Sequence, residues 1–277
     1  MTTTDGLLRR GIEGAGHHRV VVLDPAFQGL PDTAHGGSVL AVFDAVAALD
    51  GPRVLAGRYV RRVPLGLPLA LAVARDGDGT SCTLTDQAGG LLVEGRVDVA
   101  ADAPVLSPAA VTADGLPLPV SRGCLACGVD NPVGLRARLV ADDCTVSATW
   151  TPRPPLQAHG GLAPVALTTL LDETAFWLGA LATGESGMTT ELDVTLRRIP
   201  AADADVTVWG ERALVRPRRD DARYWDTRVE AWDGSGAVAS ARITFVAVRG
   251  AARRLVAALR SFNPSEVVQR VFPAYTG

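Results

Sequence analysis

The stretch that decides the fold is FQGLPDTAHGGSVLAVFDAVA, residues 27–47, in which a His-Gly-Gly tripeptide opens directly into an apolar run. A second stretch, PPLQAHGGLAPVALTTLLDETAFW at residues 154–177, carries the same tripeptide before a longer apolar run. Both runs are apolar nearly all round a helical projection, which is typical of a helix buried on every side. Each stretch therefore predicts a loop that turns sharply into a core helix.

The sequence that follows each helix also matches between the two halves. RVLAGRYVRRVP at 53–64 and TTELDVTLRRIP at 189–200 alternate as half-buried strands do, and both end in Arg-Arg, an aliphatic residue and Pro. Residues 69–100 and 205–248 then each predict three strands separated by turns such as Asp-Gly-Asp-Gly and Asp-Gly-Ser-Gly. The shared order indicates an internal duplication.

Prolines and small residues at 101–123 predict an extended connector between the halves. We therefore expect an N-terminal repeat at 1–103, a linker at 104–123, a C-terminal repeat at 124–250 and a helical tail at 251–277. The tail predicts a helix from Ala251 to about Arg260, a break at Asn263-Pro264, and a second helix capped by Ser265.

Composition excludes several classes of function. The chain has 277 residues, with 27 basic and 30 acidic side chains and a net charge of −3, so it offers no general attraction for nucleic acid or anionic membranes. No signal-peptide pattern opens it, and no unbroken apolar stretch approaches the roughly 20 residues of a membrane helix. Four cysteines are too few and too clustered for a disulfide framework. We expect a cytoplasmic globular protein.

The second half resembles a known family. CLACGVDNPVGL at 124–135, followed by His-Gly-Gly, LLDE at 170–173 and the Arg-Arg-x-Pro strand end, is similar to a bacterial branch of the hotdog-fold thioesterase superfamily. The likeness covers residues 124–248 well, and residues 18–100 share it through AHGGSVLAVFDA and the strands that follow. It implies an α+β double hotdog, in which each repeat wraps an antiparallel sheet around one long helix, and a homodimer of such chains.

The glycine turns suggest a chemical role. A helix N-terminus presents unpaired N–H groups and partial positive charge, which suit the oxyanion of thioester hydrolysis. The candidate donors are Gly36 and Gly37 in one half and Gly160 and Gly161 in the other, with His35 and His159 fixing the loops. The tripeptide is also explained by a tight strand-to-helix turn alone.

A thioesterase also needs a carboxylate to activate water or to attack. The resemblance implies an acid nine positions after the histidine, which is Asp44 in the first half but Thr168 in the second, where Asp172 and Glu173 come four and five positions later. It also implies that each site joins the turn of one fold to the acid of the other. We therefore expect a stronger site from Gly160, Gly161, Gln157 and Asp44, and a weaker one from Gly36, Gly37 and Thr168 or Asp172.

Other residues allow several interpretations. Arg61, Arg62, Arg197 and Arg198 lie at strand ends, where they could bind coenzyme A phosphates or simply face solvent. Cys124, Cys127, Cys144 and His159 could supply four zinc ligands, but no second Cys-x-x-Cys follows. A redox pair and structural packing are the alternatives, and we predict packing, with no metal and no cofactor.

The sequence thus predicts hydrolysis of an acyl thioester, most simply an acyl-coenzyme A, between the two repeats. The alternative is an acyl-binding or assembly module whose sites have degenerated. Asn-Pro at 131–132 also occurs in hydratase relatives of the fold, but the residues that follow it, up to Leu135, include no histidine that could act.

Overall fold

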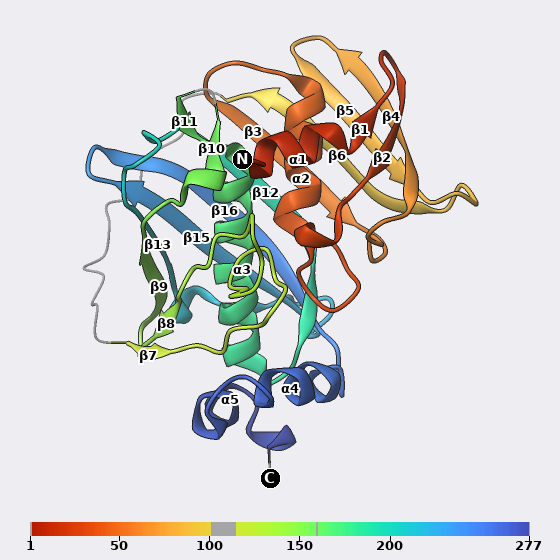
Figure 1. Cartoon of the computed structure of the whole chain (residues 1–277). Helices are drawn as coiled ribbons and strands as arrows, with labels where there is room; N and C mark the ends of the chain where they lie inside the picture. Colours follow the sequence, from red (N-terminus) through yellow and green to blue (C-terminus); the bar gives the residue numbers. More distant parts are fainter. Residues whose placement is uncertain (1, 101–114, 159, 277) are drawn as a thin grey trace.

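The computed structural model describes residues 2–100, 115–158 and 160–276, and a large antiparallel sheet wraps two buried helices in it (Figure 1). In the first half, strand alternation and Gly-rich turns produce the predicted strands and their short companions. They are β1 (Ile12–Glu13), β2 (His18–Val22), β3 (Arg53–Tyr59), β4 (Pro68–Asp76), β5 (Gly79–Thr85) and β6 (Leu91–Val99).

The second half repeats this arrangement with longer strands. They are β7 (Leu116–Pro117), β8 (Val140–Ala141), β9 (Thr145–Trp150), β12 (Gly187–Leu196), β13 (Val206–Glu211), β14 (Arg216–Pro217), β15 (Tyr224–Asp233) and β16 (Gly236–Ala247). A separate hairpin joins β10 (Gln157–Ala158) to β11 (Gly161–Leu162).

The two halves meet through one strand pair at the centre of the sheet. The main path runs β1-β2-β4-β5-β6-β3-β12-β16-β15-β13-β9-β8-β7, and β3 lies antiparallel to β12 with Leu55 opposite Val194. Outward from this pair, each half has the same succession of strands in mirrored order. The predicted duplication is therefore present in the topology.

One long helix occupies each half, and the two helices pack against each other (Figure 1). They are α2 (Gly36–Ala47) and α3 (Pro164–Thr183), and both are buried along most of their length. Gly37 permits their close approach, because a Cβ there would lie 2.4 Å from the carbonyl oxygen of Thr168. Any larger residue at this position would push the helices apart.

Within the described part of the chain, α3 is the one helix long and apolar enough to cross a membrane, with a mean hydropathy of 1.3. Its apolar window is 83% buried inside the protein, so the protein's own sheet already covers the apolar face of the helix.

The segments outside the repeats partly follow the prediction. Most of the predicted linker lies outside the described residues, but its end forms β7, where Pro117 is tolerated because the strand is at the sheet edge. The tail forms α4 (Ala252–Arg260), α5 (Ser265–Val271) and the 3-10 turn η4 (Pro273–Tyr275). Ser265 is the first residue of α5 rather than its cap, since Pro264 occupies the cap position. The N-terminus adds α1 (Thr4–Arg10).

Candidate functional site

The second-half helix does not begin at its His-Gly-Gly tripeptide, which corrects the prediction made from the repeated motif. In the first half His35 is the N-cap and α2 starts at Gly36. In the second half Gly160 and Gly161 lie in and beside the β10–β11 turn, and α3 starts only at Pro164, with Ala163 as N-cap. The motif therefore marks a helix start once, not twice.

Aligning the halves by helix cap removes the apparent shift of the acid. Asp172 follows Ala163 by nine positions, as Asp44 follows His35 by nine. The main chain supports this register, since the amide of His35 donates to Phe27 and that of Ala163 donates to Leu156, both at 2.8 Å. Asp172 is thus the structural counterpart of Asp44.

The partners of the two acids also correspond. Arg53 opens the strand pattern of the first half and Thr189 occupies the same place in the second. Arg53 holds Asp44, whereas the hydroxyl of Thr189 donates to Oδ1 of Asp172 at 2.6 Å. Asp44 is therefore neutralised by the cation of Arg53, whereas at the equivalent position Asp172 is contacted by the neutral hydroxyl of Thr189.

The first-half turn meets the second-half acid. The Gly37 amide donates to Oδ2 of Asp172 at 3.0 Å, and Nδ1 of His35 lies 3.1 Å from the same oxygen. Gly36 is equally close, because a Cβ on it would lie 2.7 Å from that oxygen. Within the described residues, the amide of Gly36 has no hydrogen-bond acceptor. A free helix-end donor and a carboxylate thus border one spot.

The electrostatics of this spot are dominated by His35 and its two carboxylates. Burial alone would lower the pKa of His35, but hydrogen bonds and charges from Asp172 and Glu173 outweigh it and raise the pKa to about 10. Burial would likewise raise the pKa of Asp172, yet His35, Thr189 and Gly37 hold it below its usual value. At neutral pH the ring is therefore protonated and Asp172 ionised, so Nδ1 donates to Asp172 rather than accepting from Gly37.

A second layer of contacts fixes the site. Tyr59 donates to the carbonyl of Gly36 at 2.6 Å, and its pKa is raised well above normal by burial and by the charge of Asp172. Trp177 donates from Nε1 to Oε1 of Glu173 at 3.0 Å. The turn and both acids are therefore held from several sides.

These residues line a cavity of about 670 Å³ between the two halves. His35, Gly36, Tyr59, Asp172 and Thr189 form its polar wall. Its apolar wall includes Leu30, Val39, Phe176, Trp177, Leu255 and Leu259. Because Leu255 and Leu259 belong to α4, the tail helps to bound the cavity. The volume is in the range of sites for small organic ligands.

Among the described residues, no hydrogen bond or ion pair joins Asp44 to Gln157, Gly160 or Gly161, which were predicted to form the stronger site with it. Asp44 forms a buried ion pair with Arg53, from Nε to Oδ1 at 2.5 Å and from Nη2 to Oδ2 at 2.9 Å. At the start of α3, Pro164 has no N–H to donate. The described residues that line the cavity do not include Asp44, Gln157, Gly160 or Gly161, and His159 lies outside the described residues.

Thr168 has a structural contact instead of a place in the cavity wall. Its hydroxyl donates to the carbonyl of Gly37 at 2.8 Å and the residue is fully buried. This contact ties α3 to the first turn of α2, which explains a polar residue inside an apolar helix.

The arginine predictions divide between the halves. Arg61 and Arg62 border the cavity, together with Arg58 and Arg218. Arg198 instead pairs with Asp233, and neither it nor Arg197 is among the described residues of the cavity wall. Of the four arginines predicted to bind coenzyme A, only Arg61 and Arg62 therefore lie where they could contact a ligand in the cavity.

The sequence reasoning also missed Thr189, Tyr59 and a role for Glu173. The Arg-Arg-x-Pro alignment already placed Thr189 opposite Arg53. Counting the acid from the helix start, rather than from the tripeptide, would have connected that pair to Asp44 and Asp172. Tyr59 and Glu173 carried no such signal, because their contacts join segments distant in the chain.

Comparisons with known proteins identify the fold. No protein-family model and no curated protein matches the sequence. A putative thioesterase II from Thermobifida fusca YX is similar in structure, with a TM-score of 0.65 and 19% identity, over 90% of this chain and 100% of that chain. A hot dog fold protein of unknown function from Alicyclobacillus acidocaldarius gives 0.59 and 13%, over 86% and 95%.

An acyl-CoA thioesterase II, TesB2, from Mycobacterium marinum gives a TM-score of 0.57 at 16% identity, over 86% of this chain and 95% of that chain. Dehydratase domains also match the fold. At these identities the likeness shows a shared architecture, not a shared activity. The chain has a hotdog fold.

Proposed function

We propose that the chain is a double hotdog that hydrolyses an acyl thioester in the cavity between its halves. The observation that carries this proposal is the meeting of the unpaired Gly36 amide with the ionised Asp172 carboxylate in the cavity wall. Hydrolysis needs a donor for the developing oxyanion and a base for water, and these two groups supply them from opposite halves.

In this mechanism the thioester carbonyl oxygen accepts from the Gly36 amide at the positive end of α2. Asp172 accepts a proton from the attacking water, whose oxygen bonds to the carbonyl carbon. The carbon–sulfur bond then breaks and the proton held by Asp172 passes to the departing sulfur, so that a carboxylic acid and a thiol are released and Asp172 is again ionised. Gly37, Thr189 and His35 are positioning residues, because they hold the Asp172 carboxylate in place.

The substrate that fits best is an acyl-coenzyme A. Arg62 borders the cavity and, among the described residues, pairs with no carboxylate, so it offers a cation for a phosphate of coenzyme A. Arg58, Arg61 and Arg218 also border the cavity, although each already pairs with a carboxylate of the protein. The apolar wall that extends to α4 suits the acyl chain. One of the structurally similar proteins is described as an acyl-CoA thioesterase, which agrees with this substrate class.

The test compares the two equivalent acids. Asp172→Asn keeps the shape of the side chain but removes its charge, and we expect thiol release from acyl-coenzyme A esters to fall by about 10²–10⁴-fold. Asp44→Asn is the matched control at the equivalent position, and turnover by its folded form should stay unchanged. Equal turnover by Asp172→Asn and the unmodified protein would refute the proposal.

Water elimination is the second candidate, because a histidine from one half faces an aspartate from the other and dehydratase domains share the fold. It needs a neutral histidine as base, whereas His35 is held protonated. A 3-hydroxyacyl thioester distinguishes the two reactions. Appearance of the enoyl thioester without free thiol would favour elimination, and saturable binding with neither product would favour the binding module.

A further inference from the structure

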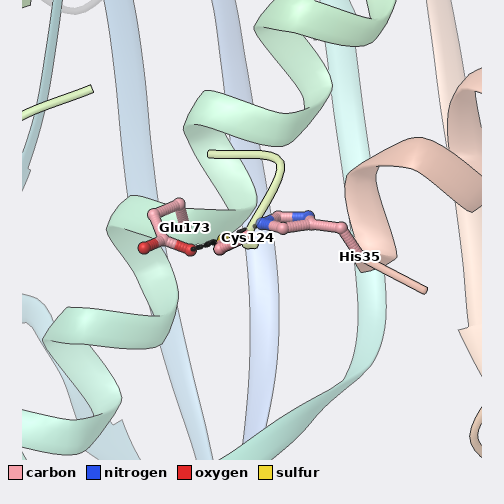
Figure 2. Close-up of side chains that lie close together, drawn as sticks. All are labelled: His35, Cys124 and Glu173. Carbon is pink, nitrogen blue, oxygen red and sulfur yellow. Dashed lines mark hydrogen bonds and ion pairs between the residues drawn. The ribbon is translucent and has the colours of Figure 1, made fainter. Parts of the chain in front are cut away.

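His35, Cys124 and Glu173 lie close together (Figure 2). All three border the cavity, as Asp172 does. The three side chains come from the cap of α2, the loop at 121–135 and the middle of α3, and all three are buried. One potential ligand atom from each lies within 4.8 Å of the other two. The mechanism above uses neither Cys124 nor Glu173.

The distances in the cluster match the edges of a metal coordination shell. Nε2 of His35 lies 3.4 Å from Oε2 of Glu173, and Sγ of Cys124 lies 3.8 Å from the same oxygen. Tetrahedral zinc, with bonds of about 2.0 Å to nitrogen and oxygen and about 2.3 Å to sulfur, separates these pairs by roughly 3.3 and 3.5 Å. Shifts of a few tenths of an ångström would bring these two pairs to coordination distance, and the third pair, His35 and Cys124, lies within 4.8 Å.

Each of the three groups also accepts or donates a hydrogen bond on the side away from the cluster, as metal ligands in proteins do. Nδ1 of His35 is bound to Asp172 at 3.1 Å, which leaves Nε2 to face the cluster. Trp177 holds the other oxygen of Glu173 at 3.0 Å. The amide of Ala126 donates to Sγ of Cys124 at 3.3 Å, a contact that fixes the position of the sulfur. A protonated His35 between two carboxylates would explain the positions of His35 and Glu173 without a metal. It would not explain why the sulfur of Cys124 is held toward them.

We propose that His35 Nε2, Cys124 Sγ and the Glu173 carboxylate bind one Zn²⁺, which displaces the protons of Nε2 and Sγ into solvent, with the fourth position open to the cavity. The mixed nitrogen, sulfur and oxygen set suits zinc, because magnesium and calcium prefer oxygen alone. Three protein ligands and an open position are typical of sites that bind water or a carbonyl oxygen. The proposal does not rest on the proposed function, since zinc binding is measurable without substrate.

The experiment measures zinc bound by the intact chain. Protein stripped with a chelator is titrated with Zn²⁺ alone against a chromophoric competitor, and metal content is measured after dialysis. We expect one zinc per chain, with affinity at least 10-fold lower in Cys124→Ser and Glu173→Gln. Cys144→Ser is the matched control, because Cys144 is an exposed free thiol, and its zinc binding should be unchanged.

Cobalt gives an independent readout. Co²⁺ bound at the same place should show visible bands of a tetrahedral ion and a near-ultraviolet thiolate band, and Cys124→Ser should remove the thiolate band. Trp177→Phe keeps all three ligands but frees Glu173, so its zinc affinity should fall by about 10-fold. Circular dichroism of each variant establishes that it is folded.

Some outcomes would overturn the site. Folded protein that binds no stoichiometric zinc would refute it, as would binding that survives Cys124→Ser and Glu173→Gln but is lost in Cys144→Ser. Cys127 is buried beside Cys124. Retention of zinc by Cys127→Ser supports the open fourth position, whereas loss would overturn that part by making Cys127 the fourth ligand.

Discussion

The ion pair between Asp44 and Arg53 gives a quantitative test of which half retains chemistry. Both side chains are more than nine-tenths buried, at 7% and 8% exposure, and two hydrogen bonds join them. Asp44→Asn removes the charge and points an amide N–H₂ or a neutral oxygen at the guanidinium. Arg53 then keeps only its bond to the carbonyl of Gly51, at 2.9 Å.

Leaving one partner of a buried pair uncompensated costs about 3–5 kcal/mol. We expect Asp44→Asn to lose roughly 3 kcal/mol of unfolding free energy, the lower end, because the Gly51 contact remains. Replacing both partners by apolar residues, Asp44→Leu with Arg53→Met, should recover most of that loss, since no charge is left buried. Urea unfolding followed by circular dichroism measures both, with thiol release measured under folding conditions.

The reasoning separates stability from activity. Asp44→Asn should unfold at lower urea, yet its folded form should turn over thioester as the unmodified protein does. A variant with full stability but a large loss of thiol release would show that Asp44, not Asp172, serves the reaction. It would also refute the assignment of the ion pair as structural.

Three further outcomes follow from the site. Gly36→Ala places a methyl group 2.7 Å from Asp172 Oδ2, and the displaced carboxylate should lower kcat/KM for thiol release by about 10²-fold at little changed stability; an unchanged value would contradict the Gly36 contact. Thr189→Val removes a hydrogen-bond donor that holds the pKa of Asp172 down, so the acidic limb of the pH–rate profile should move to higher pH. An acidic limb that does not move would exclude Thr189 as a positioning residue. Folding raises the pKa of His35 from 6.5 to about 10, so its ion pairs stabilise the metal-free protein fully below pH 6.5, and this contribution is lost as the pH rises toward 10. Urea unfolding should therefore show a free energy of unfolding that declines over this pH interval, and His35→Gln should lack the decline. An identical decline in the variant would contradict the raised pKa of His35.

The sheet was predictable from the sequence because its determinants are local. Strand alternation and Asp-Gly turns place β4, β5 and β6 and their counterparts in the second half without knowledge of the rest of the chain. The start of α2 is equally local, since a capping histidine and two glycines precede an apolar run. Both repeats could therefore be drawn before any contact was known.

The site was only partly predictable, because it depends on where α3 begins. The β10–β11 turn takes up the second His-Gly-Gly, with Gly160 at a positive φ of 83°, which a glycine accommodates easily. The same tripeptide thus satisfies a hairpin turn in one half and a helix start in the other. Main-chain pairing between Gly161 and Ala201 separates these outcomes, and that contact spans 40 positions of sequence.

The two helix starts differ in the groups that the proposed mechanism needs. The proposed mechanism needs, at each position, a free amide from one helix and, from the other, an acid that borders the cavity. At the start of α3, Pro164 lacks the amide, and the facing acid, Asp44, is bound to Arg53. At the start of α2, the Gly36 amide is free. The position equivalent to Arg53 is Thr189, whose hydroxyl donates to Asp172, so no arginine pairs with this acid. Without a donor at the start of α3, a free acid opposite it would serve no purpose in this mechanism. Restoring one without the other should therefore create no second site.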